Sequence, residues 1–226
     1  MAIHNSYVLT NMPKEFKMAK IVIFLIICLV VIIIGVVWRL LSQRISLPCP
    51  AWLHWLVERD NPFAKACQAK IIIENLNLAP GMKVLDAGSG PGRVTIPLAE
   101  KFDRQIQVTA MDIQQSMLQI VQKKAQEKNL HNIRFLHAGL GNDVLQQNHY
   151  DRAILVTVLG EIPNQRAALQ ELYTALKPGG ILSVSETVFD PHYQSKQAVI
   201  DVAQAVGFRE KKFFGNRFAY TIQFEK

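Results

Sequence analysis

Hydrophobic and polar positions divide this chain into two unlike parts. Residues 21–38 form 18 consecutive uncharged and almost wholly apolar positions, bounded by Lys20 and Arg39. At 1.5 Å per residue, a helix over this run is about 27 Å long, close to the thickness of the hydrocarbon core of a bilayer. The pattern therefore predicts a transmembrane helix near the N-terminus.

After residue 63, short apolar runs alternate with amphipathic segments of helical period. Strands separated by helices favour βαβ units. We therefore expect a doubly wound, mostly parallel, seven-stranded sheet of the Rossmann-like kind, with helices on both faces. The predicted elements are helices at 63–76, 91–101, 114–128, 164–176 and 194–206, strands at 82–87, 106–111, 133–137, 152–158 and 181–186, and a closing antiparallel pair at 208–214 and 218–224.

Four segments follow from this division of the chain. They are an N-terminal tail (1–20), the transmembrane helix (21–38), a juxtamembrane linker (39–62) and the α/β domain (63–226). The apolar run is longer than that of a signal peptide and no small-residue cleavage site follows it, which favours an uncleaved anchor. Positive charges flank the run on both sides, so charge alone does not decide its topology.

The linker contains a short amphipathic run with two tryptophans, Trp52 and Trp55. Tryptophans just beyond a span are typical of a membrane–water interface. Alternatively, this run is a helix that packs on the following domain and caps its site. Amphipathicity alone does not separate these two interpretations, and both can hold together.

Charge and cysteine content narrow the class of protein. The formal net charge is +7, but lysines and arginines are spread along the chain, so an anionic membrane surface explains the charge better than nucleic acid does. Nucleic acid is therefore an unlikely partner. Three cysteines at irregular spacing form neither a zinc motif nor a disulfide framework, and no metal site is expected.

A glycine-rich loop follows the first strand of the domain. Gly88, Gly90 and Gly92 come after Asp86, which gives D-x-G-x-G-x-G. A dinucleotide fingerprint, G-x-G-x-x-G, would need glycine where this chain has Arg93.

An acidic residue, Asp112, ends the second strand, 20 residues after Gly92. A carboxylate there is placed to bind the ribose hydroxyls of a nucleoside. Each acid also has a purely structural alternative: Asp112 would cap the next helix and Asp86 would stabilise a turn. Together with the loop between them, they favour a nucleoside site.

Four blocks of this chain, at 84–93, 111–118, 150–164 and 176–186, resemble class I S-adenosylmethionine-dependent methyltransferases. The resemblance covers roughly 63–226. It implies S-adenosyl-L-methionine as cofactor, with Ile113 beside the adenine. It also implies that Asp112 holds the ribose hydroxyls and that the amino-acid part of the cofactor lies along Asp86, Gly88, Gly90 and Gly92.

The remaining cofactor contacts are predicted at Ser89, Thr157, Gly139 and Leu140. Many relatives carry a Gly-Asp-Ala turn after the third strand, with the acid at the adenine amino group. This chain has Ala-Gly-Leu at 138–140 instead. The backbone of Gly139 and Leu140, or the carboxylate of Asp143, is expected to replace that contact.

Catalysis of methyl transfer needs the acceptor aligned and water excluded, because the cofactor carries the difficult chemistry. Glu161, in the loop after the fourth strand, and His192, after the fifth, are the predicted catalytic residues. The structural alternative for Glu161 is an exposed loop carboxylate or an acid at the start of a helix, and that for His192 is a surface loop histidine.

The sequence as a whole therefore predicts a single-pass membrane protein with a cytoplasmic methyltransferase domain. Its expected acceptor is a small molecule, such as a lipid or a quinone-type compound. Two alternatives stay open, a nucleotide-dependent oxidoreductase and a non-catalytic S-adenosylmethionine-binding module. The sequence carries no signal for an oligomeric state.

Overall fold

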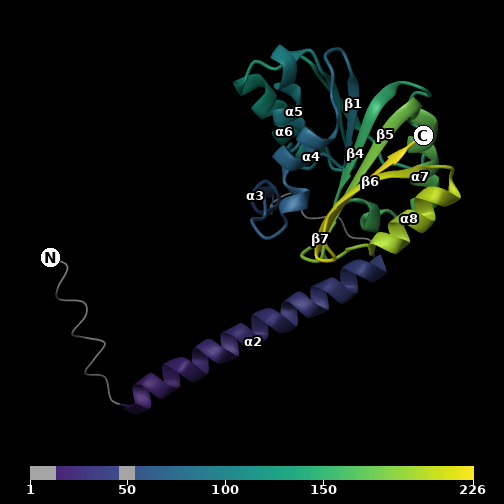
Figure 1. Ribbon diagram of the computed structural model, residues 1–226. Coiled ribbons are helices and arrows are strands. Elements are labelled where there is room, and N and C mark those ends of the chain that lie inside the picture. Colours follow the sequence, from purple (N-terminus) through teal and green to yellow (C-terminus); the bar gives the residue numbers. More distant parts are fainter. Residues whose placement is uncertain (1–13, 46–53) are drawn as a thin grey trace.

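A computed structural model of the protein describes residues 14–45 and 54–226 (Figure 1). Most of the predicted N-terminal tail, and Trp52 in the linker, lie outside the described residues.

The α/β domain is built on a mostly parallel sheet, as predicted. In the described residues the sheet has seven strands in the order β3-β2-β1-β4-β5-β7-β6, and β7 runs antiparallel to both of its neighbours. The strand order reverses between β1 and β4, which is where doubly wound sheets bind ligands. The strands are β1 (Lys83–Ala87), β2 (Gln107–Asp112), β3 (Ile133–His137), β4 (Tyr150–Val156), β5 (Leu176–Thr187), β6 (Arg209–Gly215) and β7 (Ala219–Glu225).

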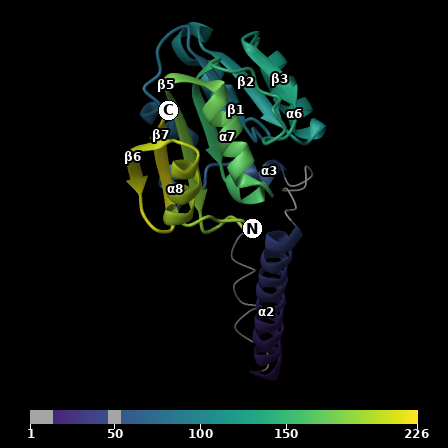
Figure 2. The same ribbon diagram turned by 90° about the vertical axis from the view of Figure 1, so that its right-hand side faces the viewer.

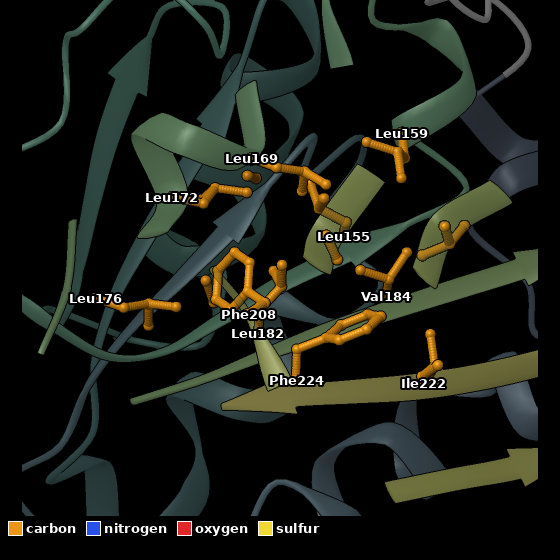
Figure 3. Packing of buried hydrophobic residues seen from close by; sticks show 14 of the residues in the cluster. Leu155, Leu159, Leu169, Leu172, Leu176, Leu182, Val184, Phe208, Ile222 and Phe224 are labelled. Atoms are coloured by element: carbon orange, nitrogen blue, oxygen red, sulfur yellow. The ribbon is translucent and has the colours of Figure 1, made fainter. Parts of the chain in front are cut away.

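Helices cover both faces of the sheet because each is apolar on one side only. One core cluster joins α4, α5 and α6 to β1 and β2, and a second joins α7 and α8 to β4, β5 and β7. Figure 3 shows the second cluster, in which Phe208 and Phe224 pack among leucines of α7 and β5. The helices are α2 (Lys14–Ile45), α3 (His54–Val57), α4 (Ala69–Asn75), α5 (Thr95–Ala99), α6 (Gln115–Glu127), α7 (Gln165–Ala175) and α8 (Lys196–Ala205), with 3₁₀ turns η2 (Lys65–Cys67), η3 (Lys101–Arg104) and η4 (Leu159–Glu161).

The helix predicted over 63–76 is wrong as a continuous element. Gln68 is extended, with φ −70° and ψ 138°, and separates η2 from α4. Two contacts fix the break, because the Asp60 carboxylate accepts from the N–H of Ala69 and the Cys67 thiol donates to the carbonyl of Glu186. Glu186 is distant in sequence and Asp60 lies outside the helical pattern, so local periodicity reveals neither contact.

The helix predicted over 91–101 is shorter than expected. Residues 91–94 form turns, and α5 covers only Thr95–Ala99. Gly92 has φ +87°, a left-handed conformation that no α-helix accepts. The glycine-rich loop therefore extends further than its sequence pattern indicated.

Helix α2 is a long rod that projects from the domain (Figures 1 and 2). Its stretch Met18–Leu41 has 24 residues and a mean hydropathy of 3.6, and its most apolar 18-residue window has no buried residue. By length and composition alone, this helix is suited to cross a membrane.

Candidate active site

A cavity of about 330 Å³ opens at the carboxyl ends of β1 to β4, where the strand order reverses. The sequence predicted most of its walls. Ten predicted site residues line it: Asp86, Gly88, Ser89, Gly90, Asp112, Ile113, Gly139, Leu140, Thr157 and Glu161. Two predicted residues, Gly92 and His192, do not.

The glycine-rich loop forms the floor of this cavity by close backbone contacts. The N–H groups of Gly88 and Ser89 both donate to the carbonyl of Met111, at 2.8 and 2.9 Å. A Cβ added at Gly88 would lie 2.3 Å from a methyl group of Val158, so only glycine fits where the β1 and β4 loops meet. Gly90, by contrast, faces open space, with nothing within 4 Å of an added Cβ.

Gly92 has a packing role in this structure and does not lie on the cavity wall. A Cβ added there would lie 3.1 Å from a methyl group of Val121 on α6 and 3.3 Å from Ile96 on α5. The third glycine of the pattern therefore brings these helices close to the loop.

Asp112 organises the loop from the end of β2. One carboxylate oxygen accepts from the N–H of Gly90 and the other from the N–H of Gln114, both at 2.8 Å. The bond to Gln114 orders the turn before α6, but the N-cap residue of that helix is Gln114 and not Asp112, so the capping role predicted as the alternative for Asp112 is wrong. Burial raises the pKa of Asp112, although these backbone bonds favour its charged form.

Asp86 lies deeper, at the end of β1. Its carboxylate accepts a hydrogen bond from the Thr95 hydroxyl at 2.6 Å. Burial raises the pKa of Asp86 to about 6, against the opposing effect of the Thr95 bond. Asp86 therefore connects the end of β1 to the first residue of α5 at the deep end of the cavity.

The turn after β3 is held by a residue that sequence reasoning missed. Glu171 on α7 is 4% exposed. Its two oxygens accept from four backbone N–H groups at 2.6 to 3.2 Å, those of Gly141, Asn142, Val144 and Leu145. Nothing in the local sequence distinguishes this glutamate from the solvated acids of other helices.

The two substitutes predicted for the missing adenine-turn acid differ in position. Gly139 and Leu140 line the cavity, whereas the exposed Asp143 does not. Asn142 also lines it, and its side-chain amide donates to the carbonyl of Gly139 at 3.0 Å. Backbone groups at 139–140, rather than Asp143, are therefore in reach of a ligand.

The loop after β4 forms the opposite wall. Thr157 has φ +55°, a rare conformation for a β-branched residue and one that clusters at functional sites. Glu161 follows in η4 and its side chain is 22% exposed. The predicted alternative of an exposed loop carboxylate is therefore wrong for Glu161, which is partly buried on the cavity wall.

His192 lies behind Glu161 and is 5% exposed, so its alternative as a surface histidine is also wrong. Its Nδ1 is 3.8 Å from carboxylate oxygens of both Glu161 and Asp190. A Cβ added at Gly160 would lie 1.9 Å from the carbonyl oxygen of His192. This close backbone contact joins the loops that carry the two predicted catalytic residues.

The linker covers one side of the cavity. Val57 of α3 lines it, Glu58 accepts from the Lys124 ammonium at 2.7 Å, and Asp60 pairs with Arg93 of the glycine-rich loop. The bond from Lys124 lowers the pKa of Glu58. The interpretation of the linker as a cap on the domain is therefore confirmed for these described residues, while Trp55 stays exposed.

A buried acid, Glu186, lies at the end of β5 next to this cluster. Its side chain is 1% exposed, and one oxygen accepts from the N–H of Gln194 at 3.2 Å. The other oxygen has no hydrogen-bond partner among the residues that the structure describes. Burial raises the pKa of Glu186 to about 8, although the bond from Gln194 lowers it.

The free energy of unfolding is therefore expected to fall as the pH rises from about 4.5 to about 8. In this range folded Glu186 keeps a proton that the unfolded chain loses, which weakens the fold by roughly 1 kcal/mol per pH unit. Glu186→Gln is expected to flatten this slope. Denaturant titrations of both proteins in detergent at several pH values measure it, and equal slopes would contradict the prediction.

The fold and the cavity together define a Rossmann-like domain that binds a nucleoside-containing cofactor. A family model described as a methyltransferase domain matches residues 78–219, which is more than half of the chain. The chain belongs to the class I S-adenosylmethionine-dependent methyltransferases, as its motifs predicted.

Individual relatives agree with this family. The chain is 30% identical over 146 residues to a demethylmenaquinone methyltransferase of Geobacillus sp. (strain WCH70), covering 65% of this chain and 57% of that protein. It is 31% identical over 134 residues to a ubiquinone/menaquinone biosynthesis C-methyltransferase of Shewanella pealeana, covering 59% and 53%. The chain thus spans about half the length of the curated relatives it matches.

A solved structure supports the fold. A S-adenosylmethionine-dependent methyltransferase from Aquifex aeolicus superposes with a TM-score of 0.70 at 19% identity, covering 79% of this chain and 99% of that one.

The residues present fit the cofactor of this family. The Ser89 hydroxyl is buried on the cavity wall and has no hydrogen-bond partner within the described part of the chain. Gly90 leaves room beside it, and the carboxylate of Asp112 faces the same cavity. The unpaired hydroxyl of Ser89 and the accessible backbone at Gly90 suit the charged amino-acid part of S-adenosylmethionine. The carboxylate of Asp112 suits its ribose hydroxyls.

Proposed function

We propose that this protein transfers a methyl group from S-adenosylmethionine to a small, quinone-type acceptor at a membrane. The observation that carries the proposal is one cavity in which the Gly88–Gly90 loop and Asp112 lie opposite Glu161. The names of the two curated relatives support a quinone ring as the acceptor. Helix α2 supports a membrane location, because such acceptors carry long apolar tails.

S-adenosylmethionine, when bound, supplies an electrophilic methyl group on a sulfonium. Asp112 would hold its ribose hydroxyls, and the loop at 88–90 would hold its amino-acid part. The β4 loop would place the acceptor ring in line with the methyl carbon, which lowers the barrier by proximity and orientation.

Glu161 is proposed as the base of the reaction. A ring carbon beside a hydroxyl becomes nucleophilic as the hydroxyl loses its proton, and the Glu161 carboxylate would accept that proton. The ring carbon would gain the methyl group that the bound cofactor supplies, with S-adenosylhomocysteine as the leaving group. The hydrogen displaced from that carbon would leave as a proton to solvent, and Glu161 would return its own proton to the ring oxygen. His192 and Asp190 are positioning residues in this scheme, because they lie behind Glu161 and off the cavity wall.

A membrane tether would raise the effective concentration of an acceptor confined to the bilayer. The proposed topology places the domain on the cytoplasmic side, where the cofactor is made. The Met18–Leu41 stretch is long enough to span the hydrocarbon core.

The test uses the full chain with methyl-labelled S-adenosylmethionine and a demethylated quinol in phospholipid vesicles. We expect label in the quinone fraction of the lipid extract and none in a reaction without protein. Transfer to a water-soluble acceptor together with none to any extracted lipid would overturn the proposed acceptor. Binding of NAD without binding of S-adenosylhomocysteine would favour an oxidoreductase instead.

A further inference from the structure

Three exposed phenylalanines gather on one side of the domain, although they come from three separate segments. Phe63, Phe189 and Phe218 are 82%, 58% and 52% exposed, and we call them the aromatic rim. The rings of Phe63 and Phe189 lie 6.5 Å apart between centroids. The segment of Phe189 is bonded to that of Phe218, because the N–H of Val188 donates to the Phe218 carbonyl at 2.8 Å.

The aromatic rim lies at the edge of the sheet onto which the cavity opens. Phe189 follows the carboxyl end of β5 by two residues. The same loop continues to Asp190 and His192, which lie against Glu161 of the cavity wall. The rim is therefore beside the cavity and not on a remote face of the domain.

Helix α2 contacts the loop that carries Phe189. The Arg39 guanidinium donates to the carbonyl of Val188 at 3.0 Å. Arg39 lies in the last turn of the apolar stretch Met18–Leu41, where a spanning helix would leave the hydrocarbon. If α2 spans the bilayer, Val188 and its neighbours must lie at the lipid surface.

The charge around the rim suits anionic headgroups. The Arg217 guanidinium lies 4.7 Å from the centroid of the Phe218 ring, and Arg217 is exposed. Lys65, two residues after Phe63, is exposed as well. Phenylalanines flanked by arginine and lysine are typical of surfaces that insert apolar side chains at the interface of an anionic membrane.

We propose that the aromatic rim is a contact surface for an anionic phospholipid bilayer. The proposal rests on the membrane location in the proposed function. The surface sets the carboxyl edge of the sheet against the lipid, so that a tailed acceptor enters the cavity from the bilayer without crossing water. Single exposed apolar residues are normal on a soluble surface, but three exposed phenylalanines on neighbouring segments, next to the contact of an apolar helix, indicate an interaction site.

Photocrosslinking tests the surface directly and independently of activity. The full chain is inserted into phosphatidylcholine vesicles that contain phosphatidylglycerol with a photoreactive headgroup, and labelled peptides are mapped by mass spectrometry. We expect label in the peptides that contain Phe63, Phe189 and Phe218. The control is Phe102, which is 42% exposed on η3 near the opposite edge of the sheet and is expected to stay unlabelled.

Variants give the second measurement. Phe189→Ser with Phe218→Ser is expected to raise KM for a vesicle-borne acceptor about tenfold, because two rings no longer enter the interface. The affinity for S-adenosylhomocysteine is expected to stay unchanged, and Phe102→Ser is the matched control for both values.

The outcomes separate this surface from the proposed function. Label confined to α2, or label equally distributed over Phe102 and the rim, would overturn the surface even if methyl transfer proceeds. Rim label in a protein that methylates no quinone would leave the surface standing and would refute the proposed acceptor. If the rim peptides take no label from lipid but crosslink to an added soluble protein, the rim binds a protein partner and the proposal is overturned.

Discussion

Asp112→Asn is expected to weaken the binding of S-adenosylhomocysteine about 100-fold or more. The carboxylate accepts from two backbone N–H groups, of Gly90 and Gln114, and the cavity places it where the ribose hydroxyls would lie. An amide accepts through only one atom and carries no charge. In the variant, both ribose hydroxyls of the ligand would lose a charged acceptor. Hydrogen bonds to charged groups contribute about 1.5–3 kcal/mol each, so weakening both ribose bonds in this way corresponds to at least about a 100-fold change in affinity.

Isothermal titration calorimetry of the full chain in detergent measures this affinity. Asp143→Asn is the matched control, because Asp143 is an exposed acid beside the same cavity region that does not line it. A circular-dichroism melt shows whether the Asp112 variant is folded. Unchanged affinity in a folded Asp112 variant would refute the proposed role of this residue.

Glu161→Gln is expected to lower kcat for methyl transfer about 100-fold and to leave cofactor affinity unchanged. A positioned general base contributes about 10² to 10⁴ to a rate. The amide keeps the size of the side chain and its place on the cavity wall, but it does not accept a proton.

Single-turnover rates with labelled cofactor separate chemistry from acceptor binding. Glu74→Gln on α4 is the control, since Glu74 is an exposed acid far from the cavity lining. His192→Gln is expected to lower kcat less than Glu161→Gln does, because His192 lies next to Glu161 and does not line the cavity. A Glu161 variant with the parent kcat would exclude the base.

The strands of the domain were predictable because each has its own local signal. The runs that form β1, β2 and β4 are short and apolar enough to be buried on both faces. Such runs are typical of central strands in a parallel sheet. The Gly88–Gly90 loop and Asp112 were predictable for the same reason. Each is recognised from a few neighbouring residues, the loop from its glycines after a strand and Asp112 from its position at the end of the next strand.

The support of the site was not predictable in this way. Glu171 holds the turn after β3 from another helix. Val57 covers the cavity from the linker, for which the sequence pattern left both a membrane-interface position and a position on the domain open. The break at Gln68 depends on contacts to Asp60 and to β5. Each of these features joins residues that are distant along the chain.

The sequence by itself determined the class of this protein. It determined the alternating elements, the glycine-rich loop with its two acids and the apolar helix, because period, turn chemistry and hydropathy are properties of neighbouring residues. Only the tertiary structure decided that Gly92 packs against α6, that His192 is buried behind Glu161, and that the end of α2 is bonded to the loop beside the cavity. Those positions depend on the packing of separate segments, which is fixed by the shape of the whole core and not by local pattern.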